Sequence, residues 1–188
     1  YDQCLPYFKA GENSDRGENQ WRGGNGYLGV TKGSFKNPLF DALEEAGTQS
    51  GQGHSEDLNG FNPEGTARLD ATRKNGRRCS AAVAHLRPAL ARGNITLITK
   101  AQVEKINISG NSATGISYRH KNKVHSAEAN KEVILSGGAI NSPHLLMLSG
   151  IGPTDHLKEH GIETKVNLPG VGQNLQDHAT VILQYACK

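Results

Sequence analysis

The chain has 188 residues, of which 35% are hydrophobic, and 21 Lys and Arg stand against 18 Asp and Glu. A formal charge of only +3, scattered along the sequence, argues against nucleic-acid binding, which needs a dense basic surface. No segment approaches the roughly 18 consecutive apolar residues of a membrane-spanning helix. The sequence begins at Tyr1 with neither Met nor an apolar signal core, which predicts that it starts inside a longer chain.

The first third of the sequence is predicted to be mostly loop. Residues 1–10 form a short amphipathic stretch, and the polar, glycine-rich run that follows to residue 37 has no sustained period. Trp21 lies within that run and either packs on another part of the protein, which we favour, or lines a surface cleft. A second loop is predicted at 48–65 because Gly, Asn and Pro punctuate it.

Two helices are predicted in the first half of the chain. Asn37 can cap a helix over 38–46, the proline after it suits the first helical position, and Gly47 suits the C-terminal end. Residues 79–92 are rich in Ala and Leu and predict a second helix. Pro88 should bend this helix because it removes a backbone donor.

The three cysteines predict neither a disulfide framework nor a metal site. Cys4, Cys79 and Cys187 are an odd number, lie far apart and form no CxxC pair, so we expect a reducing compartment. Arg77 and Arg78 would favour a thiolate at Cys79, but a small packing residue is the better interpretation of this cysteine.

Alternation of β-branched residues predicts a strand at 95–100 and then an antiparallel meander. Its three strands lie in AQVEKINISG, SATGISYRH and KVHSAEA, with turns at 110–111 and around Asn122. Residues 132–136 (EVILS) differ, because a continuous apolar run predicts a strand buried on both faces, as in a parallel sheet. A last strand is predicted at 180–185.

The turn at 136–142, between the strand predicted at 132–136 and a helix, is the strongest candidate for a ligand site. Gly137 and Gly138 let a ligand approach the backbone. The helix that follows, capped by Asn141 or Ser142, offers free N–H donors that suit a nucleotide phosphate or ribose. The spacing is not GxGxxG, and close packing is the alternative role of the glycines.

The histidines predict neither a metal cluster nor a catalytic group. His156 and His160 are four residues apart on a short helix predicted at 155–160. Because no third ligand is near them, an exposed polar face is favoured over a metal site. Asp177 and His178 either orient each other as acid and base or anchor their loop through hydrogen bonds.

The run GGAINSPHLLMLSGIG resembles the second signature of the glucose–methanol–choline (GMC) oxidoreductases, with the Ser-Pro pair, the two aliphatic residues and the closing Ser-Gly-aliphatic-Gly in place. The likeness covers essentially the whole sequence. Within the family it is strongest to the choline dehydrogenases, in NGRRCSAAVAHLRPAL, KEVILSGGAINSP and LPGVGQNLQDHATVILQYACK. Residues 65–76 depart from it by carrying less aromatic character, which leaves the substrate open.

The resemblance implies an FAD-dependent oxidoreductase in which an alcohol gives a hydride to flavin N5. The sequence resembles the middle of such an enzyme, without the N-terminal GxGxxG motif and the C-terminal catalytic histidine. We therefore assign no catalytic residue and no metal ligand, and expect the chain alone to be inactive. Choline, oxidised to betaine aldehyde, is the implied substrate of the parent enzyme; another primary alcohol or a sugar is the alternative.

By the same resemblance, four residues contact FAD. Val103 matches the position whose backbone pairs with the adenine edge, and Ser136, Gly137 and Gly138 match the segment beside the cofactor. Residues 174–178 match the loop that enters the substrate domain, and we assign them a structural role only.

The implied fold is α/β with mixed α+β character. It comprises part of a Rossmann-like parallel sheet that binds FAD, an inserted antiparallel meander, and helical and loop segments of the substrate domain. The expected division is 1–92 for helices and loops between the two domains, 93–170 for the FAD-binding part, and 171–188 for the start of a substrate-domain strand.

The partner implied by the resemblance is a small-molecule alcohol, with no nucleic acid. A buried parallel strand without neighbours leaves backbone groups unpaired, so open sheet edges favour self-association. A non-catalytic domain that binds a nucleotide or a protein is the alternative from another class. If the chain is choline dehydrogenase-like, we expect it in the cytoplasm or associated with a membrane, bacterial inner or mitochondrial, although these residues carry no visible anchor.

Overall fold

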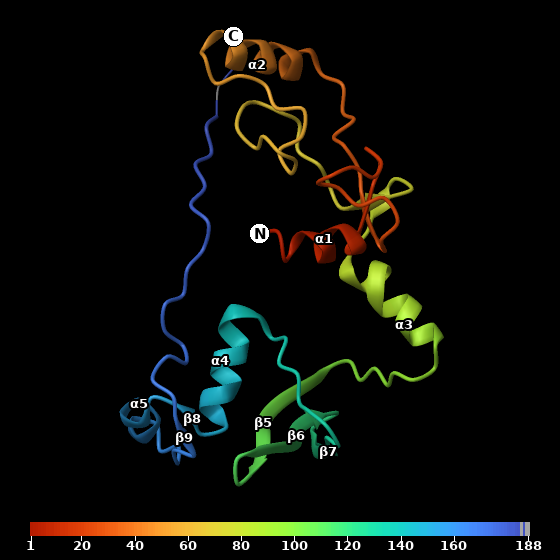
Figure 1. Ribbon diagram of the computed structural model, residues 1–188. Coiled ribbons are helices and arrows are strands. Elements are labelled where there is room, and N and C mark those ends of the chain that lie inside the picture. Colours follow the sequence, from red (N-terminus) through yellow and green to blue (C-terminus); the bar gives the residue numbers. More distant parts are fainter. Residues whose placement is uncertain (185, 187–188) are drawn as a thin grey trace. The chain divides into compact units, whose positions relative to one another are not determined.

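The computed structural model describes residues 1–184 and residue 186, and the chain forms two compact units, residues 1–97 and 98–188 (Figure 1). The first unit contains α1 (Leu5–Gly11), β1 (Glu12–Ser14), β2 (Leu28–Val30), α2 (Pro38–Gln49), β3 (Arg73–Lys74), β4 (Arg77–Arg78), the π-helix η1 (Ala82–Leu86) and α3 (Arg87–Ala91). The second contains β5 (Ala101–Ser109), β6 (Ser112–His120), β7 (Lys123–Glu128), α4 (Gly138–Leu148), β8 (Ile151–Gly152), α5 (Thr154–Glu159) and β9 (Val166–Asn167).

Part of the segment predicted as loop at the start of the chain is ordered into regular structure. The amphipathic stretch forms α1, and β1 pairs in parallel with β2, with Glu12 opposite Leu28. The loop prediction was wrong for these two strands, because a strand of three residues is too short to show a readable alternation.

α2 confirms the helix predicted after Asn37. The Asn37 side chain accepts a hydrogen bond from the backbone N–H of Leu39 at 2.9 Å, as an N-cap residue does. The expectation that Gly47 ends the helix was wrong, since α2 continues to Gln49. Gly47 is buried instead, and a Cβ there would overlap the side chain of Thr66, so the glycine serves close packing.

The second predicted helix is divided at its proline into η1 and α3. Pro88 has no N–H, and the backbone N–H of Arg87, the residue before it, bonds to the carbonyl of Ala82, five residues back. The extra residue in that turn makes it a π-helix. The helix begins a few residues later than expected because Cys79 lies before it, bonded through its backbone N–H to the carbonyl of Thr72.

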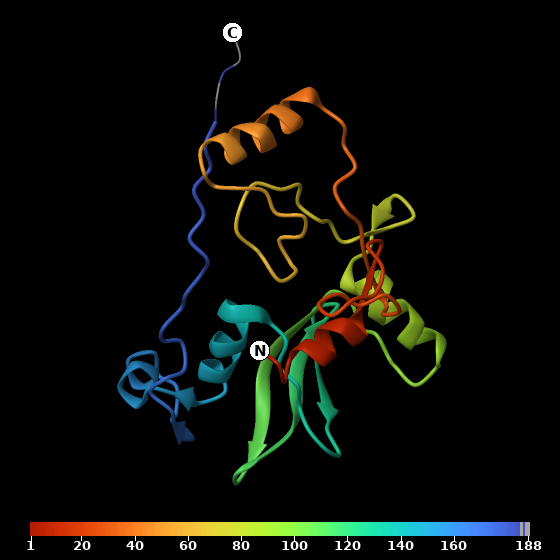
Figure 2. The same ribbon diagram turned by 45° about the horizontal axis from the view of Figure 1, so that its top comes forward.

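The antiparallel meander of the second unit agrees with the sequence (green in Figure 2). β5 pairs with β6 and β6 with β7, and Gly110 has a positive φ of 56° at the first turn. Lys121 and Asn122 both have positive φ at the second turn, as a two-residue type I′ hairpin requires.

α4 confirms a helix after the Gly-Gly pair but begins earlier than expected. The helix runs from Gly138, so neither Asn141 nor Ser142 is its N-cap, and Pro143 lies inside it. The Ser142 hydroxyl instead accepts a hydrogen bond from the backbone N–H of Gly137 at 3.0 Å, which holds the turn closed from within the first turns of the helix.

Three predicted strands are not formed. Residues 132–136 lie outside the strands, and Ile134 is 76% exposed, so the prediction of a strand buried on both faces was wrong. Residues 95–100 and 180–184 are also non-strand; residue 185, the end of the last predicted strand, lies outside the described residues. An isolated extended segment cannot satisfy its backbone groups, and none of the strand pairs among the described residues includes these segments.

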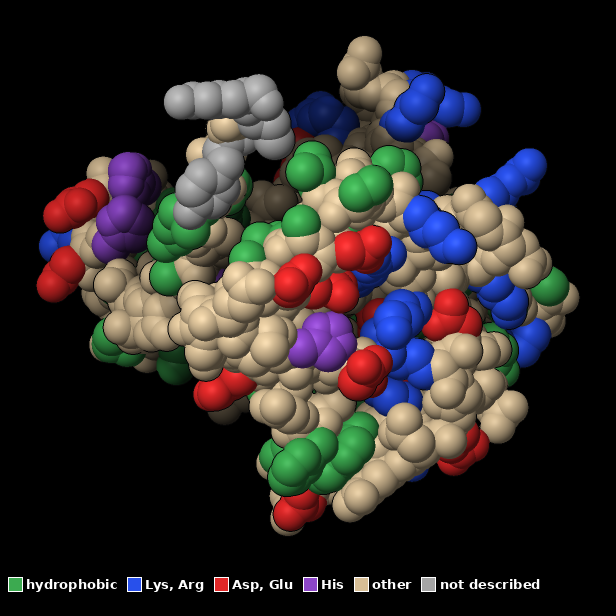
Figure 3. All heavy atoms as spheres, turned by 90° about the horizontal axis from the view of Figure 1, so that it is seen from above, with side chains coloured by type: hydrophobic (Ala, Val, Ile, Leu, Met, Phe, Trp, Pro, Cys, Tyr) green, Lys and Arg blue, Asp and Glu red, His purple; other side chains and the backbone are tan. Residues whose placement is uncertain are grey.

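Each unit has a small buried core. Cys79 and Ala84 are the buried apolar residues of the first unit, and Ile106, Leu157 and Val171 those of the second, among the residues described. Many large apolar side chains are exposed, and Figure 3 shows hydrophobic groups at several places on one face. No helix in the described part of the chain has the length and apolarity to cross a membrane.

Candidate functional site

A pocket of about 380 Å³ in the second unit brings together three of the four residues expected to contact FAD. Val103 lies on one wall, and Ser136 and Gly137 lie on the other. Gly138 is the next residue and begins α4, but it does not line the pocket. The other lining residues are Gln102, Ile116, Val133, Ile134, Leu135, Asn141, Ser142, His144, Leu145 and Leu148.

Val103 occupies an irregular place in β5. Val103 pairs with Tyr118, and Lys105 pairs with the adjacent Ser117. Two residues of β5 therefore span one step of β6, and Glu104 is left unpaired as a bulge. The Glu104 carboxylate accepts a hydrogen bond from Nε of Arg119 at 2.7 Å, which ties the bulged residue to the neighbouring strand. The bulge bends β5 next to Val103, at the point where this strand reaches the pocket.

The opposite wall of the pocket is formed by the chain segment that enters α4. Ser136 and Gly137 are exposed there, and both lie where the chain turns from the extended segment into the helix. Apolar side chains such as Leu145 and polar ones such as Asn141 and His144 line the same space. The pocket therefore offers apolar surface for a flat ring together with polar groups at its edge, a combination that fits part of FAD.

Ser149 fixes α4 against β5 and so fixes the two walls of the pocket. It is 1% exposed, its hydroxyl accepts a hydrogen bond from the backbone N–H of Ile106 at 2.8 Å, and it donates one to the carbonyl of Leu145 at 2.6 Å. The sequence reasoning assigned no role to this residue, although it is the closing Ser of the signature-like run.

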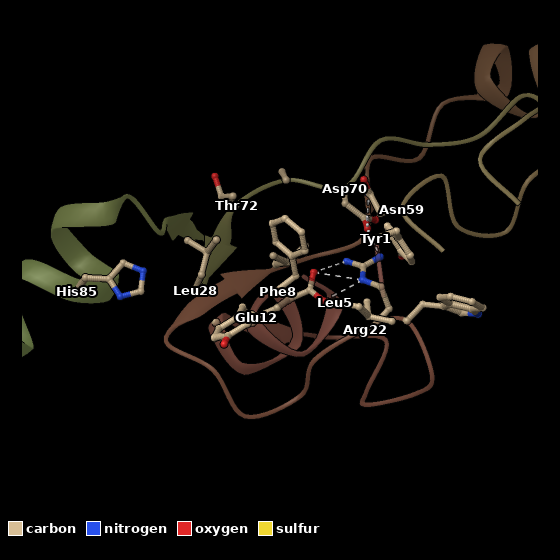
Figure 4. A pocket seen from close by; sticks show the side chains of 15 residues that line it. Tyr1, Leu5, Phe8, Glu12, Arg22, Leu28, Asn59, Asp70, Thr72 and His85 are labelled. Atoms are coloured by element: carbon tan, nitrogen blue, oxygen red, sulfur yellow. Dashed lines mark hydrogen bonds and ion pairs between the residues drawn. The ribbon is translucent and has the colours of Figure 1, made fainter. Parts of the chain in front are cut away.

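A second pocket, of about 520 Å³, lies in the first unit (Figure 4). The dashed lines of Figure 4 join Arg22 to Glu12, and Asp70 and Asn59 lie near the same guanidinium. The remaining lining residues are Tyr1, Leu5, Tyr7, Phe8, Gly11, Trp21, Leu28, Val30, Ala71, Thr72 and His85.

Arg22 is the centre of a buried ion cluster beside this second pocket. It is 2% exposed and donates to Glu12 through Nε and Nη2, at 3.0 and 2.7 Å. Its Nη1 donates to Asp57 at 2.7 Å and to Asp70 at 2.9 Å, and Arg16 donates to the other oxygen of Asp70 at 3.1 Å. Three carboxylates thus face two guanidinium groups, and the cluster ties together segments up to 54 residues apart.

The ion cluster shifts the pKa values of two members in opposite directions. The hydrogen bond to Glu12 raises the pKa of Arg22 far above its ordinary value, against the opposing effect of burial. Burial raises the pKa of Asp70, but hydrogen bonds from Arg16 and then Arg22 outweigh it, so the net shift is downward. The cluster was not found from the sequence, because an Arg in a polar, glycine-rich run reads as exposed.

The other residues singled out in the sequence are placed as follows. Trp21 lies between Tyr1 and Phe61, with ring centroids 6.3 and 5.6 Å away, and it also lines the pocket of the first unit, so it both packs and borders a pocket. Cys79 is 1% exposed and accepts a hydrogen bond from the backbone N–H of Gly29 at 3.3 Å, which confirms its packing role.

Asp177 and His178 lie in an exposed segment without helix or strand. The backbone N–H of His178 donates to the carboxylate of Asp177 at 2.7 Å, a local turn contact rather than a contact between the two side chains. Of the two interpretations offered by the sequence, this contact agrees with the structural one.

Comparisons with known proteins place this geometry in a family. The family model described as GMC oxidoreductase matches residues 1–180. The oxygen-dependent choline dehydrogenase of Staphylococcus saprophyticus is 47% identical over 190 aligned residues, which cover 100% of this chain and 34% of that protein. The mitochondrial choline dehydrogenase of Homo sapiens is 48% identical over 187 residues, covering 100% of this chain and 32% of that protein.

Solved structures of oxidoreductases also match the fold of this chain. Pyridoxine 4-oxidase from Mesorbium loti matches with a TM-score of 0.84 and 32% identity, over 90% of this chain and 33% of that one. An FAD-dependent oxidoreductase from Chaetomium thermophilum matches with a TM-score of 0.87 and 28% identity, over 94% of this chain and 33% of that one. The chain spans about a third of the length of these relatives, and it belongs to the GMC oxidoreductase family.

Proposed function

We propose that this chain forms part of an FAD-dependent oxidoreductase that oxidises choline to betaine aldehyde, and that Val103, Ser136, Gly137 and Gly138 lie along the bound FAD. The observation that carries the FAD assignment is the shared pocket of Val103, Ser136 and Gly137, which come from segments more than 30 residues apart. The substrate assignment is supported by the near 50% identity to choline dehydrogenases along the whole chain.

The bound FAD supplies a hydride acceptor, which this chain's side chains do not provide. The role of this chain is to bind and orient the cofactor. β5 is an edge strand of its three-stranded sheet, so backbone groups near Val103 can pair with a polar ring edge on the side away from β6. Ser136 and Gly137 present a wall without bulky side chains, so a cofactor can lie close to the backbone there.

A different alcohol is the competing substrate, and one solved relative favours it. Pyridoxine 4-oxidase is named for a substrate other than choline and is 32% identical to this chain, so members of this family with the same fold act on different molecules. The higher identity to the choline dehydrogenases ranks choline first.

A chimeric enzyme tests the proposed function. This chain would replace the matching third of the Staphylococcus saprophyticus choline dehydrogenase, and flavin reduction would be followed by absorbance without oxygen. We expect choline to bleach the flavin and pyridoxine to leave it oxidised. A chimera that holds FAD but is reduced by pyridoxine and not by choline would contradict the substrate assignment.

A pair of matched substitutions in the chimera separates binding from folding. Ser136→Trp fills the pocket and should lower the amount of flavin that copurifies. Ser109→Trp places the same side chain at another exposed serine of the second unit, outside the pocket, and should leave the flavin content unchanged.

Two further proposals concern the setting of the parent enzyme and the self-association of this chain. One choline dehydrogenase relative is named as mitochondrial and others come from bacteria, which supports a bacterial or mitochondrial setting for the parent enzyme. Self-association through open sheet edges stays a prediction, checked by measuring the mass of the chain in solution by light scattering.

A further inference from the structure

Two exposed histidines lie side by side at the end of α5, His156 within the helix and His160 directly after its last residue, and neither is among the residues assigned to FAD. His156 and His160 are separated by one helical turn, and both side chains are exposed. Their ring centroids are 4.8 Å apart and the rings are inclined by 75°. Neither ring takes part in the proposed function.

The distance between the rings matches that of two imidazoles on one metal ion. With metal–nitrogen bonds of about 2.0–2.1 Å, adjacent imidazole ligands place their ring centroids about 4.5–5 Å apart. The separation of the two rings therefore suits a pair of ligands on one cation. His120 and His125, the other close pair, have ring centroids 6.2 Å apart and lie across two strands, beyond that range.

The backbone that carries the two histidines is anchored by a buried side chain and by hydrogen bonds at the end of α5. Leu157, between them in sequence, is 1% exposed and anchors α5. The backbone N–H groups of His160 and Ile162 both donate to the carbonyl of Leu157, at 3.1 and 2.9 Å, and Gly161 ends the helix with a φ of 68°. A fixed backbone lowers the entropy lost when both side chains bind one ion.

We propose that His156 and His160 form a two-imidazole clamp for a divalent transition-metal ion, with Cu²⁺ bound more tightly than Zn²⁺. The sequence favoured an exposed polar face because a third ligand was missing. Within the described residues there is no group of three or more metal-binding side chains, so water completes the coordination. Imidazole pairs suit Cu²⁺ and Zn²⁺, and the general affinity order places Cu²⁺ first.

Calorimetric titration of the untagged chain with CuCl₂ and with ZnCl₂ tests the clamp. We expect one site for Cu²⁺ and a weaker one for Zn²⁺. His156→Gln and His160→Gln should each weaken Cu²⁺ binding by at least about tenfold, because a single imidazole no longer chelates. The electron paramagnetic resonance spectrum of the Cu²⁺ complex should show coupling to two nitrogens, and to one in either variant.

The control removes the same number of imidazoles elsewhere. His120→Gln combined with His125→Gln should leave Cu²⁺ affinity unchanged, and circular dichroism of every variant checks that the fold is kept. The proposal is overturned if the variants at 156 and 160 bind Cu²⁺ like the unaltered chain, or if the control pair removes the site.

Discussion

At the scale of single residues, the most consequential side chain is Arg22. It is 2% exposed and is the only guanidinium that contacts all three carboxylates of its cluster, among the residues described. Removing one partner from a buried ion pair is costly because the remaining charges lose their compensation while staying buried.

Arg22→Leu should therefore destabilise the first unit by about 3–5 kcal/mol. Urea unfolding followed by circular dichroism measures the change in the free energy of unfolding. Arg77→Leu, at an exposed arginine of β4, is the control and should change it by less than about 0.5 kcal/mol. Equal effects of the two substitutions would contradict the role given to the cluster.

Asp70 gives the first unit a defined dependence on pH. Hydrogen bonds from Arg16 and Arg22 lower its pKa in the folded state despite burial, so the folded chain holds this proton less tightly than the unfolded chain. The resulting stabilisation is complete above the unfolded pKa of about 4 and is lost as the pH falls through the lower folded value.

Asp70→Asn should lower stability at neutral pH and flatten its decline below about pH 4. Unfolding curves recorded from neutral to acid pH check this, with Asp2→Asn, at an exposed aspartate, as the control. A decline as steep in Asp70→Asn as in the unaltered chain would show that other groups cause the acid sensitivity.

Ser149 has a comparable role in the second unit. Ser149→Ala leaves the buried N–H of Ile106 without its acceptor, which should cost about 1–3 kcal/mol. Thermal unfolding measures this loss of stability. Ser109→Ala, at an exposed position of β5, the strand that contains Ile106, should have little effect. If both substitutions leave the unfolding temperature unchanged, Ser149 does not hold α4 against β5.

At the scale of elements, the docking of α2 rests on a glycine. Gly47→Ala normally favours a helix, but here the added Cβ would overlap the side chain of Thr66, and we expect a loss of about 1–3 kcal/mol. Gly11→Ala, in α1 with open space around it, should instead be neutral or stabilising.

A double substitution separates this overlap from other effects of the added methyl group. Thr66→Ser deletes the methyl that meets the new Cβ and keeps the hydroxyl that donates to the carbonyl of Gly53 at 3.0 Å. It should recover part of the stability lost in Gly47→Ala. Additive losses in the double variant, measured by urea unfolding, would mean that the two side chains do not meet.

Elements whose signals are local could be predicted from the sequence, and those that depend on distant partners could not. Asn37 and Pro38 specify the start of α2, and the turn at Lys121 and Asn122 specifies the last hairpin. Residues 132–136 have strand composition but need neighbouring strands to pair with, which an apolar run does not supply.

The candidate site was predictable only in part for the same reason. The turn with Ser136 and Gly137 was a ligand-site candidate from the residues alone, and Val103 was found through a family resemblance. The pocket that unites three of the four FAD residues depends on how β5 packs beside α4. The buried roles of Arg22 and Ser149 follow from contacts between distant segments, which neither periodicity nor composition encodes.

At the scale of the whole molecule, the chain is a family member that spans a third of its relatives' length and exposes many large apolar side chains. Exposed apolar surface of this extent is typical of faces that contact a ligand or another protein surface. Within this surface, we propose that the pocket between β5 and α4 holds part of FAD.

Titration of FAD into the chain, followed by the quenching of flavin fluorescence, tests that claim most directly. We predict saturable quenching at one FAD per chain, weakened by at least about tenfold in Ser136→Trp because the side chain fills the pocket, and unchanged in Ser109→Trp. Quenching that never saturates, or that is the same in both variants, would contradict the assignment of this pocket to the cofactor.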